Sequence, residues 1–219
     1  METALHRQLK TRFGPEAGGR SEVALAGFRI DAVDPDGSLV EVQSGALGPL
    51  RPKIARLLLE HRVRVVKPVV IARRIVRRKT RDGVDLSSRL SPKRGEALDV
   101  FDDLMGLIGL FPHPNLTIDV MEVVIDEVRV ARRRWPGYRV VDRALREVGR
   151  IVHLRVAPDL WRLIPATIVG ERFTTIDLAS ALGRPLVFAQ RVAYCLRVGG
   201  AAVAVGKLGN RIIYNRVGS

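Results

Sequence analysis

Cysteine is almost missing from this chain of 219 residues, and histidine and aromatic residues are scarce. Because Cys195 stands alone, the sequence excludes an intramolecular disulfide framework and a cysteine-ligated zinc site. The spacing of the histidines is not that of a metal motif. The sequence also has no Gly-rich phosphate loop and no Ser-His-Asp order. These absences exclude disulfide scaffolds, zinc modules, P-loop proteins and triad hydrolases.

Long hydrophobic runs are also missing. The longest stretch without a formal charge, 104–118, is broken by Pro112 and Pro114 and is too short to cross a bilayer. Residues 1–10 lack the apolar segment of a signal peptide. We therefore expect a cytoplasmic protein of a bacterium or archaeon that has no membrane partner.

What the chain has in excess is positive charge. There are 37 Lys and Arg residues against 23 Asp and Glu residues, which gives a net charge of +14. Hydrophobic residues make up 47% of the chain, enough to build a core. Residues 1–80 and 157–219 carry the basic surplus, and residues 81–156 are nearly balanced. A folded protein of this kind favours a polyanionic partner, most simply nucleic acid, contacted at two places.

The pattern of the first half predicts a mixed α/β unit. We expect a helix over 2–12, strands within 22–34 broken near Gly27, a strand over 38–44, a helix over 50–61 and strands over 62–78. The sequence Asp34-Pro35-Asp36-Gly37 predicts a tight turn. Further along, 82–95 is expected to be a loop, 97–110 a helix and 115–131 a strand, and 138–154 is left open.

The predicted hairpin around that turn brings acidic residues together. Glu41 and Gln43 share one face of their strand, and Asp31 lies opposite Glu41 to within about one residue. Glu22 adds an acid from the preceding strand. Magnesium is typically held by one or two carboxylates together with a phosphate, so these residues are candidate metal ligands. The alternative is that Asp31 serves the turn and Glu41 is a solvated strand residue.

The spacing of Asp31 and Glu41-Val42-Gln43, leading into a helix, resembles the PD-(D/E)XK nuclease superfamily. The resemblance implies a restriction-endonuclease-like α-β-β-β-α-β core with a mixed sheet. It implies that Asp31 and Glu41, with Glu22 as an additional acid, bind Mg²⁺ or Mn²⁺, which activates water to attack a phosphodiester. The nuclease-like domain would span 1–156, with its core at about 2–80 and an extension over 81–156.

The sequence departs from this superfamily at one position. A Lys usually follows the second acid by two residues, and here that position is Gln43. Some restriction enzymes of the superfamily carry Gln there, and other members recruit a Lys from the next helix. Lys53 is placed for that role, and we expect Gln43 and Lys53 to orient water or substrate. The alternative for Lys53 is a surface lysine whose stem lies along the helix.

A strongly basic run follows the predicted core. Six of the nine residues from Arg73 to Arg81 are basic. One interpretation is a strand edge that contacts phosphates, and the other is a solvated strand face whose charges protect the edge. The candidate nucleic-acid contacts here are Arg73, Arg74, Arg77, Arg78 and Lys79.

The last segment, 157–219, has a different pattern. We expect helices over 159–166, 176–182 and 185–197, followed by a hairpin of strands 201–205 and 211–216 joined by the turn 206–210. This order resembles the winged helix-turn-helix family, which implies DNA binding through a recognition helix and a wing. The implied contacts are Gln190, Arg191, Arg197, Lys207, Asn210 and Arg211. The alternative is a module that binds proteins.

The sequence thus predicts metal-dependent hydrolysis of DNA phosphodiester bonds by an endonuclease-type enzyme aided by a winged helix. The whole arrangement also resembles an uncharacterised prokaryotic family that joins these two parts. The expected partner is duplex or branched DNA, and a homodimer is left open. One alternative is a non-catalytic DNA-binding regulator with a degenerate nuclease fold, and a second is an RNA-binding or RNA-processing protein.

Overall fold

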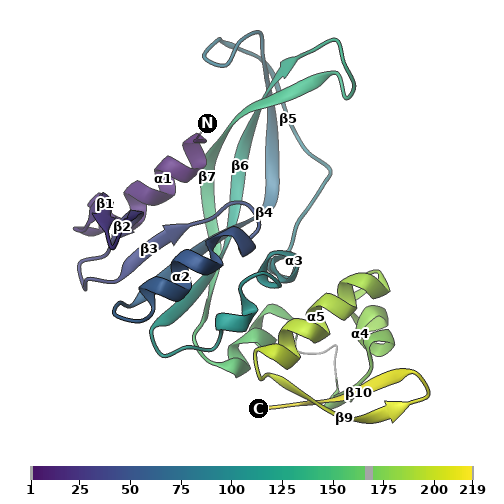
Figure 1. Ribbon diagram of the computed structural model, residues 1–219. Helices are drawn as coiled ribbons and strands as arrows, with labels where there is room; N and C mark the ends of the chain where they lie inside the picture. Colours follow the sequence, from purple (N-terminus) through teal and green to yellow (C-terminus); the bar gives the residue numbers. More distant parts are fainter. Residues whose placement is uncertain (1, 166–169, 219) are drawn as a thin grey trace. The chain divides into compact units, whose positions relative to one another are not determined.

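The computed structural model describes residues 2–165 and 170–218, and its chain folds as a mixed α/β protein (Figure 1). The α/β class and the mixed sheet expected from the sequence are confirmed. Its elements in chain order are α1 (Ala4–Phe13), η1 (Pro15–Ala17), β1 (Arg20–Leu25), β2 (Phe28–Val33), β3 (Leu39–Val42), η2 (Gly48–Leu50), α2 (Arg51–Leu57), β4 (Val63–Arg78), β5 (Asp85–Leu90), η3 (Ala97–Val100), α3 (Phe101–Leu104), η4 (Ile108–Leu110), β6 (Leu116–Ala131), β7 (Tyr138–Leu154), η5 (Ala157–Leu163), β8 (Arg172–Phe173), α4 (Thr175–Leu182), α5 (Leu186–Val198), β9 (Ala202–Leu208) and β10 (Arg211–Arg216).

The strands form two sheets. The larger sheet has seven strands in the order β1-β2-β3-β4-β6-β7, and β5 pairs with β4 outside this path. Strands β1, β2 and β3 form an antiparallel meander, whereas β3 and β4 are joined by a long connection that contains α2. The smaller sheet has three strands in the order β8-β10-β9. No helix in the described ranges is long and apolar enough to cross a membrane.

The chain divides into two compact units that alternate along the sequence. The first unit comprises Met1–Ser44, Val66–Ala97 and Val120–Ile151, and the second comprises Gly45–Val65, Leu98–Asp119 and Val152–Ser219. The long strands β4, β6 and β7 each contribute to both units. The C-terminal segment therefore shares a unit with residues from the predicted nuclease-like region.

Helix α1 covers the meander and builds the core of the first unit. Thr3 caps the helix through the backbone N–H of His6, and Leu5 and Leu9 lie on one face because they are four residues apart. The core cluster contains three residues of α1 and seven of the sheet: Leu5, Leu9, Phe13, Ala32, Val40, Val42, Val66, Met121, Val123 and Ile125. Since successive strand residues point to opposite faces, the acids at 31 and 41 lie outside this core.

The predicted turn between β2 and β3 is confirmed. Gly37 has a φ of +81° and its N–H donates to Asp34 O, while Asp34 N–H donates to Ser38 O. A positive φ is accessible to glycine without steric cost, so this turn is determined locally. The turn sets the register of the two strands that carry Asp31 and Glu41.

Several predicted elements differ in the structure. The strands predicted over 62–78 form one strand, β4, over Val63–Arg78, and the predicted loop 82–95 contains strand β5. All six residues of β5 are exposed, so it has no alternation of buried and polar residues that would reveal a strand. The open segment 138–154 is strand β7, and the second helix ends at Leu57 instead of at 61.

The predicted helix over 97–110 is broken into η3, α3 and η4. A Cβ on Gly106 would lie 2.4 Å from Gly48 Cα, so the backbones of these two glycines are in contact. Only glycine permits this approach, and the local chain follows it instead of continuing a regular helix. The apolar spacing of 97–110 predicts burial of Leu98, Phe101, Leu104 and Met105, which is correct for the first three and wrong for Met105, which is 38% exposed.

The C-terminal part of the second unit follows the sequence prediction closely. Thr174 and Asp177 form a capping box at the start of α4, and Gly183 ends the helix with a φ of +60°. Helix α5 begins after Pro185, and the hairpin β9–β10 turns at 209–210. Residues 157–163 form the 3₁₀ helix η5 in place of the predicted helix 159–166, whose last residue lies outside the described ranges.

Candidate functional site

Asp31 and Glu41 lie opposite each other at the end of the β2–β3 ladder, as predicted. The ladder pairs Val33 with Leu39 and Ala32 with Val40, and the next position in this register places Asp31 opposite Glu41. Beyond Ala32, side chains join the strands: Val42 N–H donates to Asp31 Oδ2 at 2.9 Å, and Asp31 N–H donates to Glu41 Oε1 at 3.3 Å. Each acid therefore holds the backbone of the opposite strand.

Glu22 continues this row of acids on β1. The pairs Ser21↔Ala32 and Val23↔Ile30 bracket it, so Glu22 lies opposite Asp31. Its φ of +57° is a left-handed value that non-glycine residues rarely adopt. Acids on three neighbouring strands thus occupy equivalent positions.

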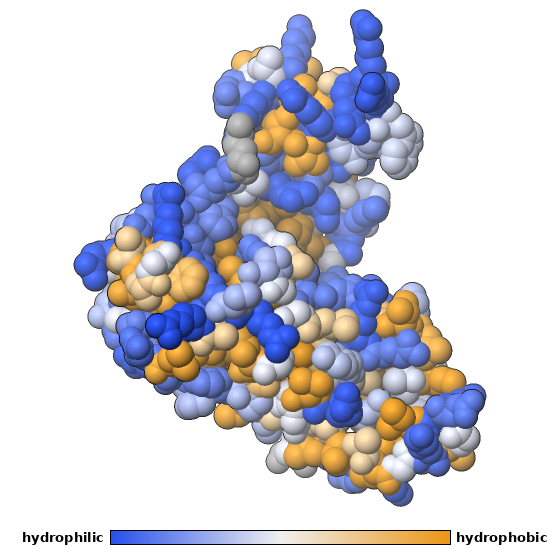
Figure 2. Space-filling view, viewed as in Figure 1, coloured by the Kyte–Doolittle hydropathy of each residue, from blue (hydrophilic) through white to orange (hydrophobic). Residues whose placement is uncertain are grey.

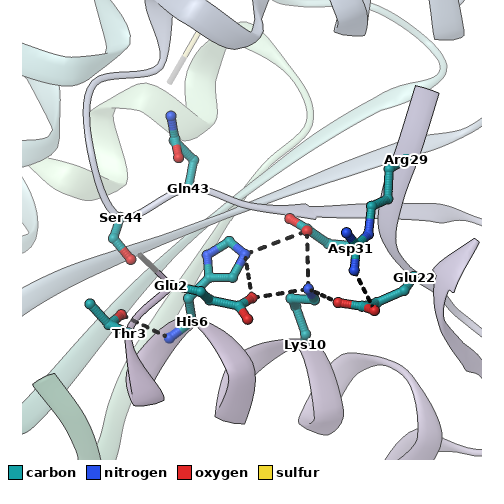
Figure 3. Close-up of a pocket in the computed structure, with 9 residues that line it drawn as sticks. All are labelled: Glu2, Thr3, His6, Lys10, Glu22, Arg29, Asp31, Gln43 and Ser44. Carbon is teal, nitrogen blue, oxygen red and sulfur yellow. Dashed lines mark hydrogen bonds and ion pairs between the residues drawn. The ribbon is translucent and has the colours of Figure 1, made fainter. Parts of the chain in front are cut away.

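Helix α1 directs the side chains of Lys10 and His6 at these acids (Figure 3). Lys10 Nζ lies 2.7 Å from Glu22 Oε1, 3.0 Å from Glu2 Oε1 and 3.8 Å from Asp31 Oδ1. His6 Nε2 lies 3.4 Å from Asp31 Oδ1. His6 and Lys10 are four residues apart and so share the face of α1 beside the buried Leu5–Leu9 stripe.

These residues surround an open pocket of about 480 Å³. Charged and polar residues of α1 and of the first three strands line it, and all of them belong to the first unit. Arg29 also binds Glu22 across the pocket, with Nη2 2.5 Å from Oε2. The complete lining is Glu2, Thr3, His6, Lys10, Glu22, Arg29, Asp31, Gln43 and Ser44 (Figure 3).

The ion pairs shift the titration of the pocket residues. Burial opposes ionisation of Asp31, but hydrogen bonds from His6 and from Val42 N–H, with the charges of His6 and Lys10, lower its pKa. Hydrogen bonds from Lys10 and Arg29 lower the pKa of Glu22. The pKa of Lys10 is raised because its carboxylate partners, Glu22 foremost, outweigh its partial burial. The carboxylates of Asp31 and Glu22 therefore stay ionised at neutral pH.

The predicted metal set is only partly assembled. Among the described residues, no group of three or more His, Cys, Asp or Glu side chains is arranged to hold a metal ion. Glu22 is shared between Lys10 and Arg29, so it does not join Asp31 and Glu41 as a third ligand. Mg²⁺ typically needs only one or two carboxylates, with the remaining positions left to water and phosphate. Of the two remaining acids, Asp31 lines the pocket, whereas Glu41 is 3% exposed and is not among the described residues that line it.

Gln43 lines the pocket, and a lysine that sequence reasoning did not single out lies beside it. Gln43 N–H donates to Val66 O, and the next residue of β4, Lys67, donates from Nζ to Ser44 O at 3.1 Å. Lys67 is 2% exposed, whereas lysines are almost never fully buried without a partner. The predicted Lys53 belongs to α2 in the second unit and does not line the pocket.

A signal for these cations was present in part. Lys67 follows Val65-Val66 and precedes Pro68-Val69, so it is the one charge within the apolar stretch 65–72, and that contrast marks a buried functional or paired residue. The contacts of Lys10 and His6 with the acids could not be predicted from the sequence, because no motif near these residues indicates which strands α1 packs against.

A family model described as "Domain of unknown function (DUF8091)" matches residues 3–155. The chain belongs to the DUF8091 family. An uncharacterised protein of Treponema pallidum (strain Nichols) is 36% identical over 221 residues, covering 98% of this chain and 85% of the relative. The relative therefore shares the C-terminal segment as well as the family region. No solved structure matches the chain.

The basic run of this DUF8091 protein is largely tied to acids of its own sheet. Arg73 Nη1 lies 3.3 Å from Glu127 Oε2, and Arg74 binds Asp126 through two hydrogen bonds of 2.8 and 2.6 Å. Arg78 Nε lies 2.6 Å from Asp85 Oδ1, while Arg77 and Lys79 are exposed. The run is therefore partly paired with acids of the sheet and partly exposed.

The C-terminal candidates lie on the exposed surface of the second unit. Gln190, Arg191 and Arg197 are exposed on α5, and Arg191 Nη1 lies 2.8 Å from Asp102 Oδ1. The opposite face of α5 is buried. Lys207, Asn210 and Arg211 are exposed at the tip of the β9–β10 hairpin.

Proposed function

We propose that this protein binds DNA and hydrolyses its phosphodiester bonds in a metal-dependent, endonuclease-type reaction, as a relative of the PD-(D/E)XK nucleases. The observation that carries the proposal is the placement of Asp31 opposite Glu41 where the β2–β3 ladder ends. The order α1-β1-β2-β3-α2-β4 is the α-β-β-β-α-β order of that core, which supports the same assignment. Asp31 lines a pocket that is open to solvent and large enough for part of a DNA backbone.

Asp31 and Glu41 are the residues that would hold Mg²⁺ or Mn²⁺. When bound, the ion supplies a Lewis acid and lowers the pKa of its water, which makes hydroxide available at neutral pH. The chain itself keeps Asp31 ionised through His6 and Val42 N–H. Gln43 offers an amide to orient water or a phosphate oxygen, in keeping with its place in the pocket lining.

A cation is still required to offset the negative charge that develops on the phosphate. Lys67 is our candidate for this charge, because it lies next to Gln43 and Ser44 on the neighbouring strand. Lys53 remains a prediction that a kinetic measurement decides. Replacing each lysine with methionine keeps the apolar stem, so single-turnover rates of the two variants separate the candidates.

DNA binding would involve the second unit as well. The order η5, β8, α4, α5, β9, β10, with β8 paired to β10, is that of a winged helix, which supports this proposal for residues 157–219. Gln190 and Arg197 would face the major groove of the DNA, and the hairpin residues Lys207, Asn210 and Arg211 would contact DNA phosphates. Arg191 would act only if it exchanged Asp102 for a phosphate.

A second function is favoured by one specific observation. Lys10 already lies among Glu2, Glu22 and Asp31, where it supplies the positive charge that a metal ion would bring. This arrangement fits a non-catalytic DNA-binding protein with a degenerate nuclease fold. An RNA-binding role uses the same basic residues, and competition between duplex DNA and duplex RNA separates the two partners.

The deciding experiment joins cleavage to metal binding. Duplex, single-stranded and branched DNA, with duplex RNA as competitor, are incubated with Mg²⁺ or Mn²⁺ and the wild type, Asp31→Asn, Glu41→Gln or Glu16→Gln. Glu16 is an exposed acid outside the pocket and serves as the matched control. We expect cleavage and calorimetric Mn²⁺ binding to be lost in the first two variants only. DNA binding with neither cleavage nor Mn²⁺ binding in the wild type would establish the non-catalytic function.

A further inference from the structure

A second cavity, of about 560 Å³, lies in the first unit between β4, β5, β6 and the start of β7. This volume is in the range of small-molecule sites. Four arginines from three strands line it: Arg77, Arg78, Arg89 and Arg129. Among the described residues, no acidic side chain is part of the lining. The cavity is thus a concentrated source of guanidinium groups that is separate from the acid pocket.

The four arginines differ in what holds them. Asp85 lies 2.6 Å from Arg78 Nε, and Glu127 lies 2.6 Å from Arg129 Nη2. Arg77 and Arg89 have no acidic partner among residues 2–165 and 170–218. Arg89 Nη1 makes only a long contact of 3.5 Å to Leu90 O. Two of the four guanidinium groups that line the cavity therefore lack a counter-charge within the described ranges, which matches the two negative charges of a phosphate monoester or of two phosphodiesters.

Two consecutive arginines line the same cavity at an irregularity in the sheet. Along a regular strand Arg77 and Arg78 would point to opposite faces. The β4–β5 register shifts between them, since Arg77 pairs with Ser87 and Arg78 pairs with Asp85. Bulges of this kind re-aim side chains and recur next to functional sites. The extra residue is Leu86 of β5, which lines the cavity together with Arg77 and Arg78.

The rest of the lining suits a planar, weakly polar group. Leu86, Pro136 and the ring of Tyr138 form an apolar wall, and the Arg129 guanidinium lies 3.9 Å from the centre of that ring. Figure 2 shows a hydrophobic patch among strongly hydrophilic side chains at the top of the view, where these strands end. Aromatic rings and arginine planes bind nucleobases by stacking. Phosphate and base chemistry therefore occur side by side.

We propose that this cavity binds one phosphate-bearing nucleotide, with its phosphate on Arg77 and Arg89 and its base against Leu86 and Tyr138. The nucleotide is either free or an unpaired unit of a nucleic-acid strand. In the second case the inference rests on the proposed nucleic-acid binding, but it does not depend on cleavage.

The test is equilibrium binding, measured by intrinsic fluorescence and by polarisation of a labelled strand. Trp135 is 90% exposed beside Pro136 and reports on the cavity. The probes are thymidine, thymidine 5′-monophosphate, a single strand of twelve thymidines and its duplex with twelve adenosines. The variant is Arg77→Gln/Arg89→Gln. The control is Arg133→Gln/Arg134→Gln, which removes the same charge from exposed residues of the β6–β7 turn outside the lining.

We expect the single strand to bind the cavity variant about tenfold more weakly than the wild type, and the control within about twofold. The slope of log affinity against log salt should become shallower by about 0.7 for each phosphate that the cavity variant no longer binds. Tyr138→Leu should weaken binding of the single strand more than binding of the duplex. Binding of the monophosphate but not of thymidine assigns a free nucleotide, and binding of the strand alone assigns a unit of the strand.

Equal weakening by the two double variants would overturn the proposal, because it would mean a diffuse electrostatic surface. Absence of binding of every probe to the wild type would overturn it as well. Asp31→Asn is measured in parallel. If the wild type and Asp31→Asn both bind the strand and neither cleaves it, the proposed nuclease activity is refuted and the cavity proposal is unaffected.

Discussion

The acid pocket beside α1 and the arginine cavity between β4 and β7 are two places where the same sheet gathers charge, and they handle it in opposite ways. In the pocket, Lys10 and Arg29 are bound to carboxylates. In the cavity, Arg77 and Arg89 have no acidic partner within the described ranges. The pocket therefore balances its charge internally, whereas two arginines of the cavity have no internal counter-charge within the described ranges. The net charge of +14 is thus not a uniform property of the surface.

The largest effect should come from the acid side of this comparison. If the proposed reaction takes place, Asp31→Asn should lower the single-turnover cleavage rate by at least about 10²–10³-fold, because it removes one of the two carboxylates proposed to hold the metal ion. DNA affinity should stay within about threefold. Rate and affinity falling together would instead make Asp31 a residue that supports folding or binding, and thermal unfolding of the same variant distinguishes those two.

The next effect tests whether Lys10 stands in for a metal. Lys10→Met leaves Glu2, Glu22 and Asp31 without their shared cation, and should lower the free energy of unfolding by about 1–3 kcal/mol. Mn²⁺ should recover part of this stability and bind more tightly than to the wild type, since it no longer competes with the ammonium group.

Chemical denaturation with and without Mn²⁺ measures both parts of that prediction. Arg12→Met is the control, because Arg12 is an exposed cation on the same helix. A Lys10 variant that Mn²⁺ does not stabilise would remove the metal from the proposal and favour the non-catalytic function.

A smaller effect should follow from the second unit. Lys207→Gln/Arg211→Gln removes two exposed cations from the tip of the β9–β10 hairpin. If both contact phosphate, the slope of log affinity against log salt should become shallower by about 1.8 for duplex DNA. Affinity titrations between low and moderate salt give this slope. An unchanged slope would mean that this hairpin contacts something other than DNA, as expected for a winged helix that binds proteins.

The smallest effect concerns acid stability. The pKa of Asp31 is lowered in the folded protein, so its ionised form stabilises the fold above the unfolded pKa of about 3.8. That contribution should be lost as the pH falls through the folded value. Asp31→Asn should therefore flatten the decline of thermal stability between about pH 5 and pH 2.5 relative to Glu16→Gln. Parallel curves for the two variants would contradict the ion-pair assignment.

Sequence reasoning succeeded where the determining contacts are local. Gly37 and the Asp34–Ser38 turn set the register of Asp31 against Glu41, so their juxtaposition could be predicted. The caps at Thr174 and Gly183 placed α4 in the same way. A turn or a helix cap is determined by the backbone preferences of a few neighbouring residues, so it can be predicted from a short stretch of sequence.

The prediction failed where distant segments decide. Strand β5 is exposed along its whole length and exists because β4 supplies its hydrogen-bonding edge. Lys10 reaches the acids because α1 packs on the meander through Leu5 and Leu9. The sequence near β5 and near Lys10 does not encode these contacts, since both depend on which distant surfaces pack together in the folded chain.

The contact between Gly48 and Gly106 has a consequence for the descent of this family. A Cβ on Gly106 would collide with the Gly48 backbone, whereas a Cβ on Gly48 would lie at an ordinary 3.6 Å from Gly106 Cα. No substitution at position 48 can compensate for a larger residue at 106, because the partner is already the smallest residue. In any relative that keeps this contact, we therefore expect alanine to be tolerated at position 48 and glycine to be required at position 106.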